Sequence, residues 1–191
     1  TRVITSGIGS IGDLNVTINI AGRSGGGFNG DLYVTLTHES GYSVLLNRPG
    51  RRTDCVYGYA DNGFNVTLDD QAANGDVRQY RLKLGGSETT SIAGALTGIW
   101  APDARATDPD LVLASNPRTR PLSSFNYLDA SGSWTLFVAD LESGGLVKLV
   151  SWALNISSVP EPETYGLAVG AGLPGLAAAR RFRWRTASAR E

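Results

Sequence analysis

The sequence predicts an all-β fold, an antiparallel jelly-roll-like β-sandwich with a short C-terminal hydrophobic helix as a sorting tail. Three observations support this class. Short segments alternate apolar and polar residues, turns rich in glycine separate them, and no amphipathic helical pattern occurs before the tail. With 191 residues, of which 41% are apolar, the chain is long enough for one domain with a core and a modest appendage.

The first strands are predicted from strict alternation. Residues 14–20 place aliphatic side chains on one face and Asn or Thr on the other, and residues 31–37 repeat the pattern. A turn at 38–41 leads into residues 42–47, so these two segments are expected to form a hairpin. The side chains expected to point inward are Leu14, Val16, Ile18 and Ile20, then Leu32, Val34 and Leu36, then Phe64, Val66 and Leu68.

The middle of the chain is less regular. Residues 48–63 are predicted to form a long loop, and residues 70–130 to form loops with one or two edge strands. Alternation returns in residues 131–140 and 149–157, each of which contains one tryptophan, Trp134 and Trp152. Because the turn between them is short and indole rings bury large areas, we expect these two strands to pair near the centre of the fold.

Composition excludes several kinds of chemistry. The formal net charge of -1 gives no indication of nucleic-acid binding. Cys55 is the single cysteine, which excludes an internal disulfide and a multi-cysteine zinc site. His38 is the single histidine and is expected to be an exposed residue of the hairpin turn. Since no Ser-His-Asp arrangement is indicated, we expect no catalytic residues and no enzyme activity in this chain.

Four aspartates are candidates for a calcium site. Asp31, Asp69, Asp70 and Asp140 all stand at predicted strand ends, where carboxylates and backbone carbonyls can converge. Calcium prefers such oxygen ligands. The alternative is that these carboxylates cap backbone groups in turns or remain solvated.

The order of motifs in residues 1–157 resembles the P domain of proprotein convertases, also called the Homo B domain. The motifs are IGDLNVTINI, GDLYVTLTHESG, FNVTLDDQA, GIWAPD, SGSWTLFVAD and SWALNI. The resemblance implies a non-catalytic jelly roll found outside the cytoplasm, with a binding or structural role. It also implies an alternative, in which the domain stabilises a subtilisin-like serine endopeptidase whose catalytic domain is not in this chain.

The C-terminal segment differs from the body. Residues 158–163 are expected to be a linker, because two prolines within three residues cannot continue a sheet. Residues 164–191 are expected to form a short transmembrane-like segment with a basic end, uncharged from Thr164 to Ala179. The basic cluster comprises Arg180, Arg181, Arg183 and Arg185. The alternative is a disordered basic tail that binds anionic surfaces.

This three-part order resembles a PEP-CTERM sorting signal, on the motif Val159, Pro160, Glu161 and Pro162 and the arginine cluster. The resemblance implies recognition by an exosortase and transient retention in the inner membrane of a Gram-negative bacterium. It further implies delivery to the cell surface, the outer membrane or the extracellular matrix, where extracellular polysaccharide is a possible partner.

Overall fold

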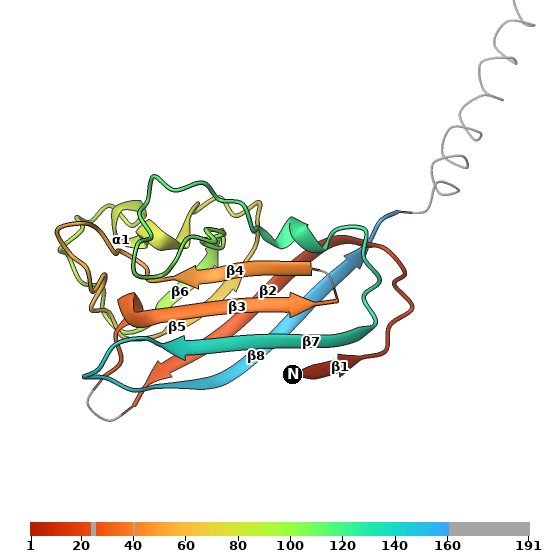
Figure 1. Ribbon diagram of the computed structural model, residues 1–191, viewed down its shortest axis with the longest axis horizontal. Helices are drawn as coiled ribbons and strands as arrows, with labels where there is room; N and C mark the ends of the chain where they lie inside the picture. The colour runs from red at the N-terminus through yellow and green to blue at the C-terminus, as the bar shows by residue number, and fades with distance from the viewer. Residues whose placement is uncertain (24–25, 40, 161–191) are drawn as a thin grey trace, which may run out of the picture. The chain divides into compact units, whose positions relative to one another are not determined.

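The computed structural model describes residues 1–23, 26–39 and 41–160, and over these residues the fold is two four-stranded sheets with little helix (Figure 1). The first sheet has the order β1 (Arg2–Ile4), β7 (Gly132–Asp140), β3 (Leu32–His38) and β4 (Gly41–Asn47). The second has the order β6 (Leu96–Trp100), β5 (Phe64–Leu68), β2 (Ile11–Gly22) and β8 (Val147–Ser158). The helical elements are the single turn α1 (Tyr80–Lys83) and the 3-10 turns η1 (Asn29–Asp31), η2 (Val77–Gln79) and η3 (Leu122–Phe125). The prediction of an all-β fold is confirmed.

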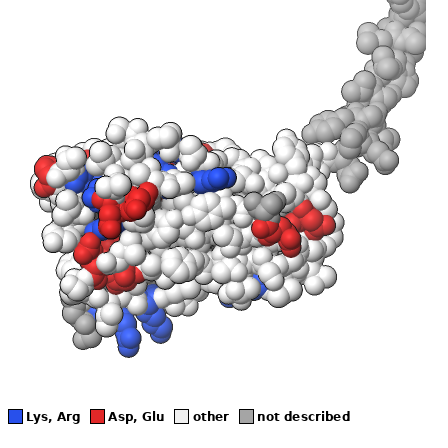
Figure 2. All heavy atoms as spheres, viewed as in Figure 1, with Lys and Arg blue, Asp and Glu red and all other residues white. Residues whose placement is uncertain are grey.

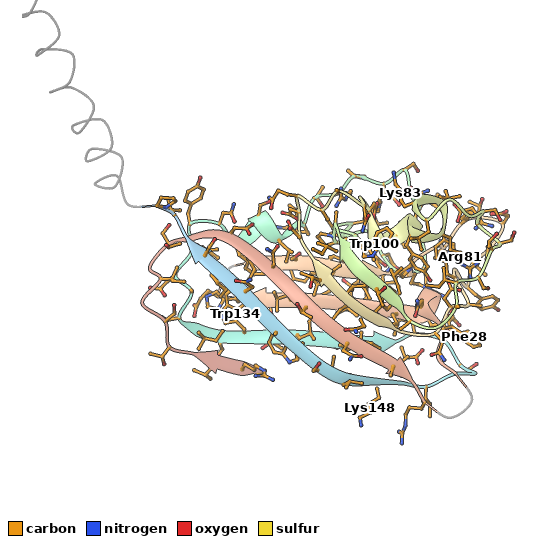
Figure 3. The ribbon with its side chains drawn as sticks, turned by 180° about the vertical axis from the view of Figure 1, so that it is seen from behind. Phe28, Arg81, Lys83, Trp100, Trp134 and Lys148 are labelled. Carbon is orange, nitrogen blue, oxygen red and sulfur yellow. The ribbon has the colours of Figure 1, made fainter. Side chains whose placement is uncertain are left out.

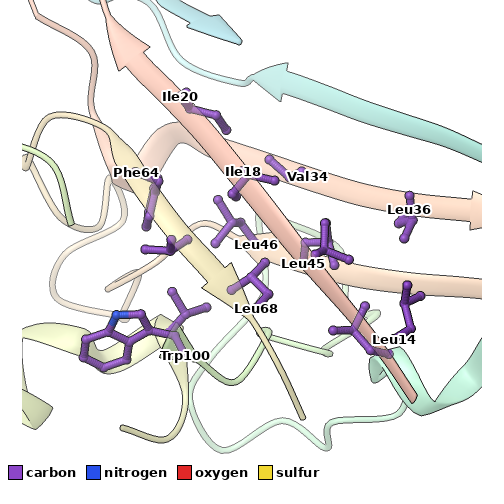
Figure 4. Close-up of a cluster of buried hydrophobic side chains, with 14 of the residues drawn as sticks. Leu14, Ile18, Ile20, Val34, Leu36, Leu45, Leu46, Phe64, Leu68 and Trp100 are labelled. Carbon is purple, nitrogen blue, oxygen red and sulfur yellow. The ribbon is translucent and has the colours of Figure 1, made fainter. Parts of the chain in front are cut away.

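The core lies between the two sheets (Figure 4). Alternate residues of β2, β3 and β5 are fully buried there, as the sequence pattern predicts. Leu45 and Leu46 of β4 and Trp100 at the end of β6 complete the same cluster. Burial of apolar surface in one continuous cluster is the main force that holds the sheets face to face.

The predicted hairpin is confirmed, since β3 and β4 pair in antiparallel register from Tyr33↔Asn47 to His38↔Gly41. The predicted pairing of the two tryptophan strands is wrong. β7 lies between β1 and β3 in the first sheet, whereas β8 pairs with β2 in the second. The connection at 141–146 therefore carries the chain from one sheet to the other instead of closing a hairpin. β5 and β6 form a parallel pair, the exception in an otherwise antiparallel set of strand pairs.

His38 is also not the exposed residue that the sequence predicts. Its exposed fraction is 1%, and its ring stacks on Trp134 with the ring centroids 4.0 Å apart. The two residues are opposite each other in the β3/β7 register, so both side chains point to the same face. The ring nitrogens face the carbonyl oxygens of Ser133 (3.2 Å) and Asp129 (2.8 Å). His38 is therefore a packed core residue.

The long loops around α1 contain buried ion pairs, which we call the arginine network. Its members are Arg78, Arg81 and Arg105 with Asp61, Asp76 and Asp103. The guanidinium of Arg78 also donates hydrogen bonds to the carbonyls of Arg51 (2.8 Å) and Val112 (3.0 Å). Segments without regular secondary structure are thus held together by charge pairs within the domain.

Most of the predicted sorting tail lies outside the described residues. This applies to Glu161, Pro162, the uncharged segment and the four arginines. β8 ends at Ser158, and Val159 and Pro160 follow it outside any helix or strand. Within the part of the chain that the structure describes, no helix is both long and apolar enough to cross a membrane.

Candidate functional site

A pocket of about 320 Å³ opens where β3 begins and β7 ends. Phe28, Tyr57 and Tyr59 supply aromatic groups to its wall, and Asp31 and Glu142 supply carboxylates. We call this site the acidic pocket. Acidic and basic side chains lie together at this end of the molecule, on the left in Figure 2, and a second acidic group lies towards the right. Phe28 lies at the same end as Arg81, and Trp134 lies towards the opposite end (Figure 3).

Strand pairing brings the acidic groups together. Asp31 ends the 3-10 turn η1 directly before β3, and its carbonyl accepts a hydrogen bond from the N–H of Leu141 (2.9 Å). Leu32 is opposite Asp140 in the β3/β7 register. Glu142 follows the end of β7 by two residues. Carboxylates from two segments far apart in the sequence, Asp31 on one and Asp140 and Glu142 on the other, therefore lie near one sheet end.

The opposite wall, residues 57–60, is fixed by close backbone contacts. The N–H of Gly30 donates to the carbonyl of Tyr59 (2.8 Å), and the N–H of Tyr59 donates to the carbonyl of Pro49 (2.9 Å). A Cβ atom on Gly30 would lie 2.1 Å from the carbonyl oxygen of Tyr57, so only glycine allows this approach. Gly58 has a φ of 70°, a conformation that also favours glycine.

The ring of Tyr59 is held by the arginine network. The guanidinium carbon of Arg81 lies 4.5 Å from the ring centroid, and the Tyr59 hydroxyl donates a hydrogen bond to Glu88. Since Tyr59 is buried, its position is set by packing. The pocket therefore has one rigid aromatic wall.

Asp31 is buried without a direct partner. Its exposed fraction is 3%, and no hydrogen bond from the described residues reaches its carboxylate. Burial raises the pKa of Asp31 to about 6; the nearby charge of Asp140, and to a lesser degree that of Glu142, adds to the rise, and Arg48 opposes it.

The carboxylate of Asp140 also lacks a hydrogen-bond partner within the described parts of the chain, and both of its oxygens are buried. Burial raises the pKa of Asp140, and the nearby backbone N–H of Glu142 opposes that rise. Two adjacent carboxylates are thus desolvated and only partly compensated, which costs free energy unless a cation is supplied.

The cation closest to this group is already engaged. Arg48 is buried and donates to Asp110 (2.9 Å) and to Glu142 (2.6 Å), while its Nε donates to the carbonyl of Gly30 (3.2 Å). The neighbourhood therefore combines four carboxylates with one guanidinium. The arrangement favours the binding of positive charge.

The four aspartates predicted to bind calcium separate into two places. Asp31 lines the pocket and Asp140 lies beside it, opposite Leu32 in the strand register. Asp69 and Asp70 bond to turns elsewhere. Asp70 accepts hydrogen bonds from the N–H groups of Leu122 (3.1 Å) and Ser123 (2.7 Å), and Asp69 accepts one from that of Gln71 (2.7 Å). Over residues 1–23, 26–39 and 41–160 no group of three or more His, Cys, Asp or Glu side chains has an arrangement that could hold a metal ion.

The sequence did not indicate Glu142 or the aromatic wall as parts of a site. The available signal was the spacing of Asp140 and Glu142, two acidic residues separated by one position at a strand end. Phe28, Tyr57 and Tyr59 give no such signal, because they lie in loops whose contacts are long-range.

Fold and site together define the class of this protein as an all-β, sandwich-like domain with an acidic, aromatic-walled pocket. No family model, curated protein or solved structure matches the chain.

Proposed function

We propose that the chain is an exported, non-catalytic binding module, with a P-domain-like jelly-roll body and a C-terminal helical tail that directs sorting to the cell surface. The observation that carries the binding role is the acidic pocket. Asp31 has an exposed fraction of 3% and lines an open pocket. Its carboxylate has no hydrogen-bond partner within the described chain. A structural module would have no need to retain such a costly group.

The likeness to P domains is supported by where its most specific motifs lie. GDL at 30–32 leads into β3, and SGSWTLFVAD at 131–140 forms β7, the strand next to it. The pocket lies at the shared end of these two strands. Of these motif residues, Asp31 lines the pocket.

The sorting role rests on the Val159 to Pro162 motif, the uncharged segment and the arginine cluster. Its test is intact-mass measurement and fractionation of the protein from its own host, with and without the sorting enzyme. A mature chain that ends near Pro162 in the surface fraction supports the proposal. Unchanged export and surface display after deletion of residues 159–185 would refute it.

The second candidate is an accessory domain that stabilises a subtilisin-like serine endopeptidase. The motif order that resembles a convertase P domain favours it. The coding sequence upstream of Thr1 separates the two candidates. A catalytic domain there would support the accessory role, and a signal peptide alone would support the binding module.

A further inference from the structure

The acidic pocket contains more negative charge than the described chain neutralises. Among the described residues, Asp31 lines the pocket without a hydrogen-bond partner, and the adjacent Asp140 has two buried carboxylate oxygens without one. The one guanidinium nearby in the described chain, that of Arg48, is shared between Asp110 and Glu142. Buried carboxylates in folded proteins are normally paired or bound to a metal. The occupant that would complete this site must therefore be a cation.

The size and wall of the pocket indicate which kind of cation. A volume of about 320 Å³ is at the lower end of the range for small-molecule sites, roughly 300–1,000 Å³, and is far larger than a metal ion requires. Calcium needs about six to eight oxygen ligands, and the described residues provide no cluster of metal-binding side chains. Aromatic rings beside carboxylates are instead suited to organic cations, which are attracted to both.

We propose that the acidic pocket binds an organic cation, the ammonium or guanidinium group of a basic ligand, with Asp31 as its counter-ion and Phe28 and Tyr57 as its aromatic contacts. This inference rests on the proposed binding function and names its ligand class. Tyr57 is 65% exposed at the mouth, whereas Asp31 lies at depth, so a ligand with an apolar stem and a charged end would satisfy both. A lysine or arginine side chain of a partner protein and a free polyamine share this chemistry.

The test is calorimetric titration of the full chain at pH 7.5 and low ionic strength. The probes are N-acetyl-lysine methylamide, N-acetyl-arginine methylamide and spermidine, with N-acetyl-norleucine methylamide as the uncharged control. We expect the charged probes to bind, the norleucine probe to bind at least about tenfold more weakly, and added NaCl to weaken the charged probes. Binding of the capped amino acids indicates a protein partner, and binding of spermidine alone indicates a free polyamine.

Two variants and one matched control locate the binding. Asp31→Asn should weaken binding by at least about tenfold, because it removes the buried counter-ion. Asp129→Asn makes the same charge change at an exposed carboxylate outside the pocket, and should leave the affinity unchanged. Tyr57→Ala, at an exposed position where misfolding is not expected, should weaken binding by about two- to fivefold.

Three results would overturn the proposal: no binding of any charged probe, equal affinity in Asp31→Asn and Asp129→Asn, or equal affinity for the lysine and norleucine probes. A fourth is a melting temperature that calcium raises and chelator lowers in the wild type but not in Asp31→Asn, which would identify a metal site. None of these affects the sorting test. Loss of binding with surface display retained would reject only the ligand class, and loss of surface display with binding retained would reject only the sorting role.

Discussion

The arginine network and the acidic pocket are both rich in buried charge, but each carboxylate of the network has an arginine partner. In the network, Asp61 accepts hydrogen bonds from Tyr80 (2.6 Å), from the backbone N–H of Ile92 (3.0 Å) and from two nitrogens of Arg81 (2.7 and 2.9 Å). At the pocket, neither Asp31 nor the adjacent Asp140 has such side-chain donors among the described residues. Carboxylates that are fully hydrogen-bonded fix the shape of the loops, whereas carboxylates without partners remain available to a ligand.

The different surroundings of Asp61 and Asp31 shift their pKa values in opposite directions. Burial tends to raise the pKa of Asp61, but hydrogen bonds from Arg81, Tyr80 and Ile92 bring it below the usual value. Burial raises the pKa of Asp31, and Asp140 raises it further. The same residue type therefore stabilises the fold in one region and destabilises it in the other at neutral pH.

The largest expected effect comes from breaking the network at Arg78. Its guanidinium pairs with Asp103 (3.2 Å), and both side chains are fully buried. Arg78→Ala leaves that carboxylate undercompensated and should lower the free energy of unfolding by about 3–5 kcal/mol, measured by chemical denaturation. Lys83→Ala, at an exposed position of α1, is the control and should change it by less than about 0.5 kcal/mol. A loss below 1 kcal/mol for Arg78→Ala would contradict a structural role for the network.

A smaller loss is expected from Asp61→Asn, about 2–3 kcal/mol, because charge-assisted hydrogen bonds are weakened and Arg81 loses its partner. The pKa of Asp61 is lower in the folded state than in the unfolded chain. Its contribution is therefore present above the unfolded pKa, near pH 4, and is lost as pH falls through the folded value. Acid titration of unfolding should show a shallower loss of stability in the variant than in the wild type. Parallel titration curves would argue against this role.

Asp31→Asn should have the opposite sign and raise the free energy of unfolding by about 1–2 kcal/mol at pH 7.5. The folded pKa of about 6 lies above the unfolded value, so the folded state binds more protons between about pH 6 and pH 4. Wild-type Asp31 therefore favours unfolding at neutral pH, and this penalty is relieved as pH falls through 6. The groups that face Asp31 are Asp140, Glu142 and Arg48, and Asp140 titrates in the same direction.

The measurement is the melting temperature between pH 5 and pH 8, with Asp129→Asn as the charge-matched control. The difference between Asp31→Asn and the wild type should shrink as the pH is lowered. A variant less stable than the wild type at pH 7.5 would show that Asp31 already has a partner.

The smallest effect is expected at an exposed pair. Arg52 bonds to Asp54 at 3.0 Å, but the side chain of Asp54 is 73% exposed. Solvent screens such pairs, so Asp54→Asn should leave the melting temperature unchanged within measurement error. A clear decrease would mean that surface pairing contributes to holding the loop that leads to Tyr57.

Much of the fold could be predicted because its signals are local. The alternation in β2, β3 and β5 is visible in a few residues, and the hairpin of β3 and β4 follows from a short turn between two such segments. The pairing of β7 and β8 could not be predicted in this way. Each has its partner far along the chain, and a short connection between two sheets has the same length as a hairpin turn.

The candidate site could be predicted only in part. Asp31 and Asp140 were indicated as acidic groups at strand ends, but so were Asp69 and Asp70, which bond to turns instead. Nothing in the sequence around Arg78, Arg81 or Arg105 distinguishes a buried arginine from a solvated one. Burial of a charge depends on partners that the chain supplies from distant positions.

By itself, the sequence determined the all-β class, the inward faces of the main strands and the candidate sorting motif at Val159 to Pro162, because each is encoded within a few neighbouring residues. The tertiary structure decided which strands share a sheet, that His38 is buried, and which carboxylates meet. These outcomes depend on backbone pairing and packing between distant segments. The same residue type, aspartate, therefore becomes a structural partner in the arginine network and an unpaired charge in the acidic pocket.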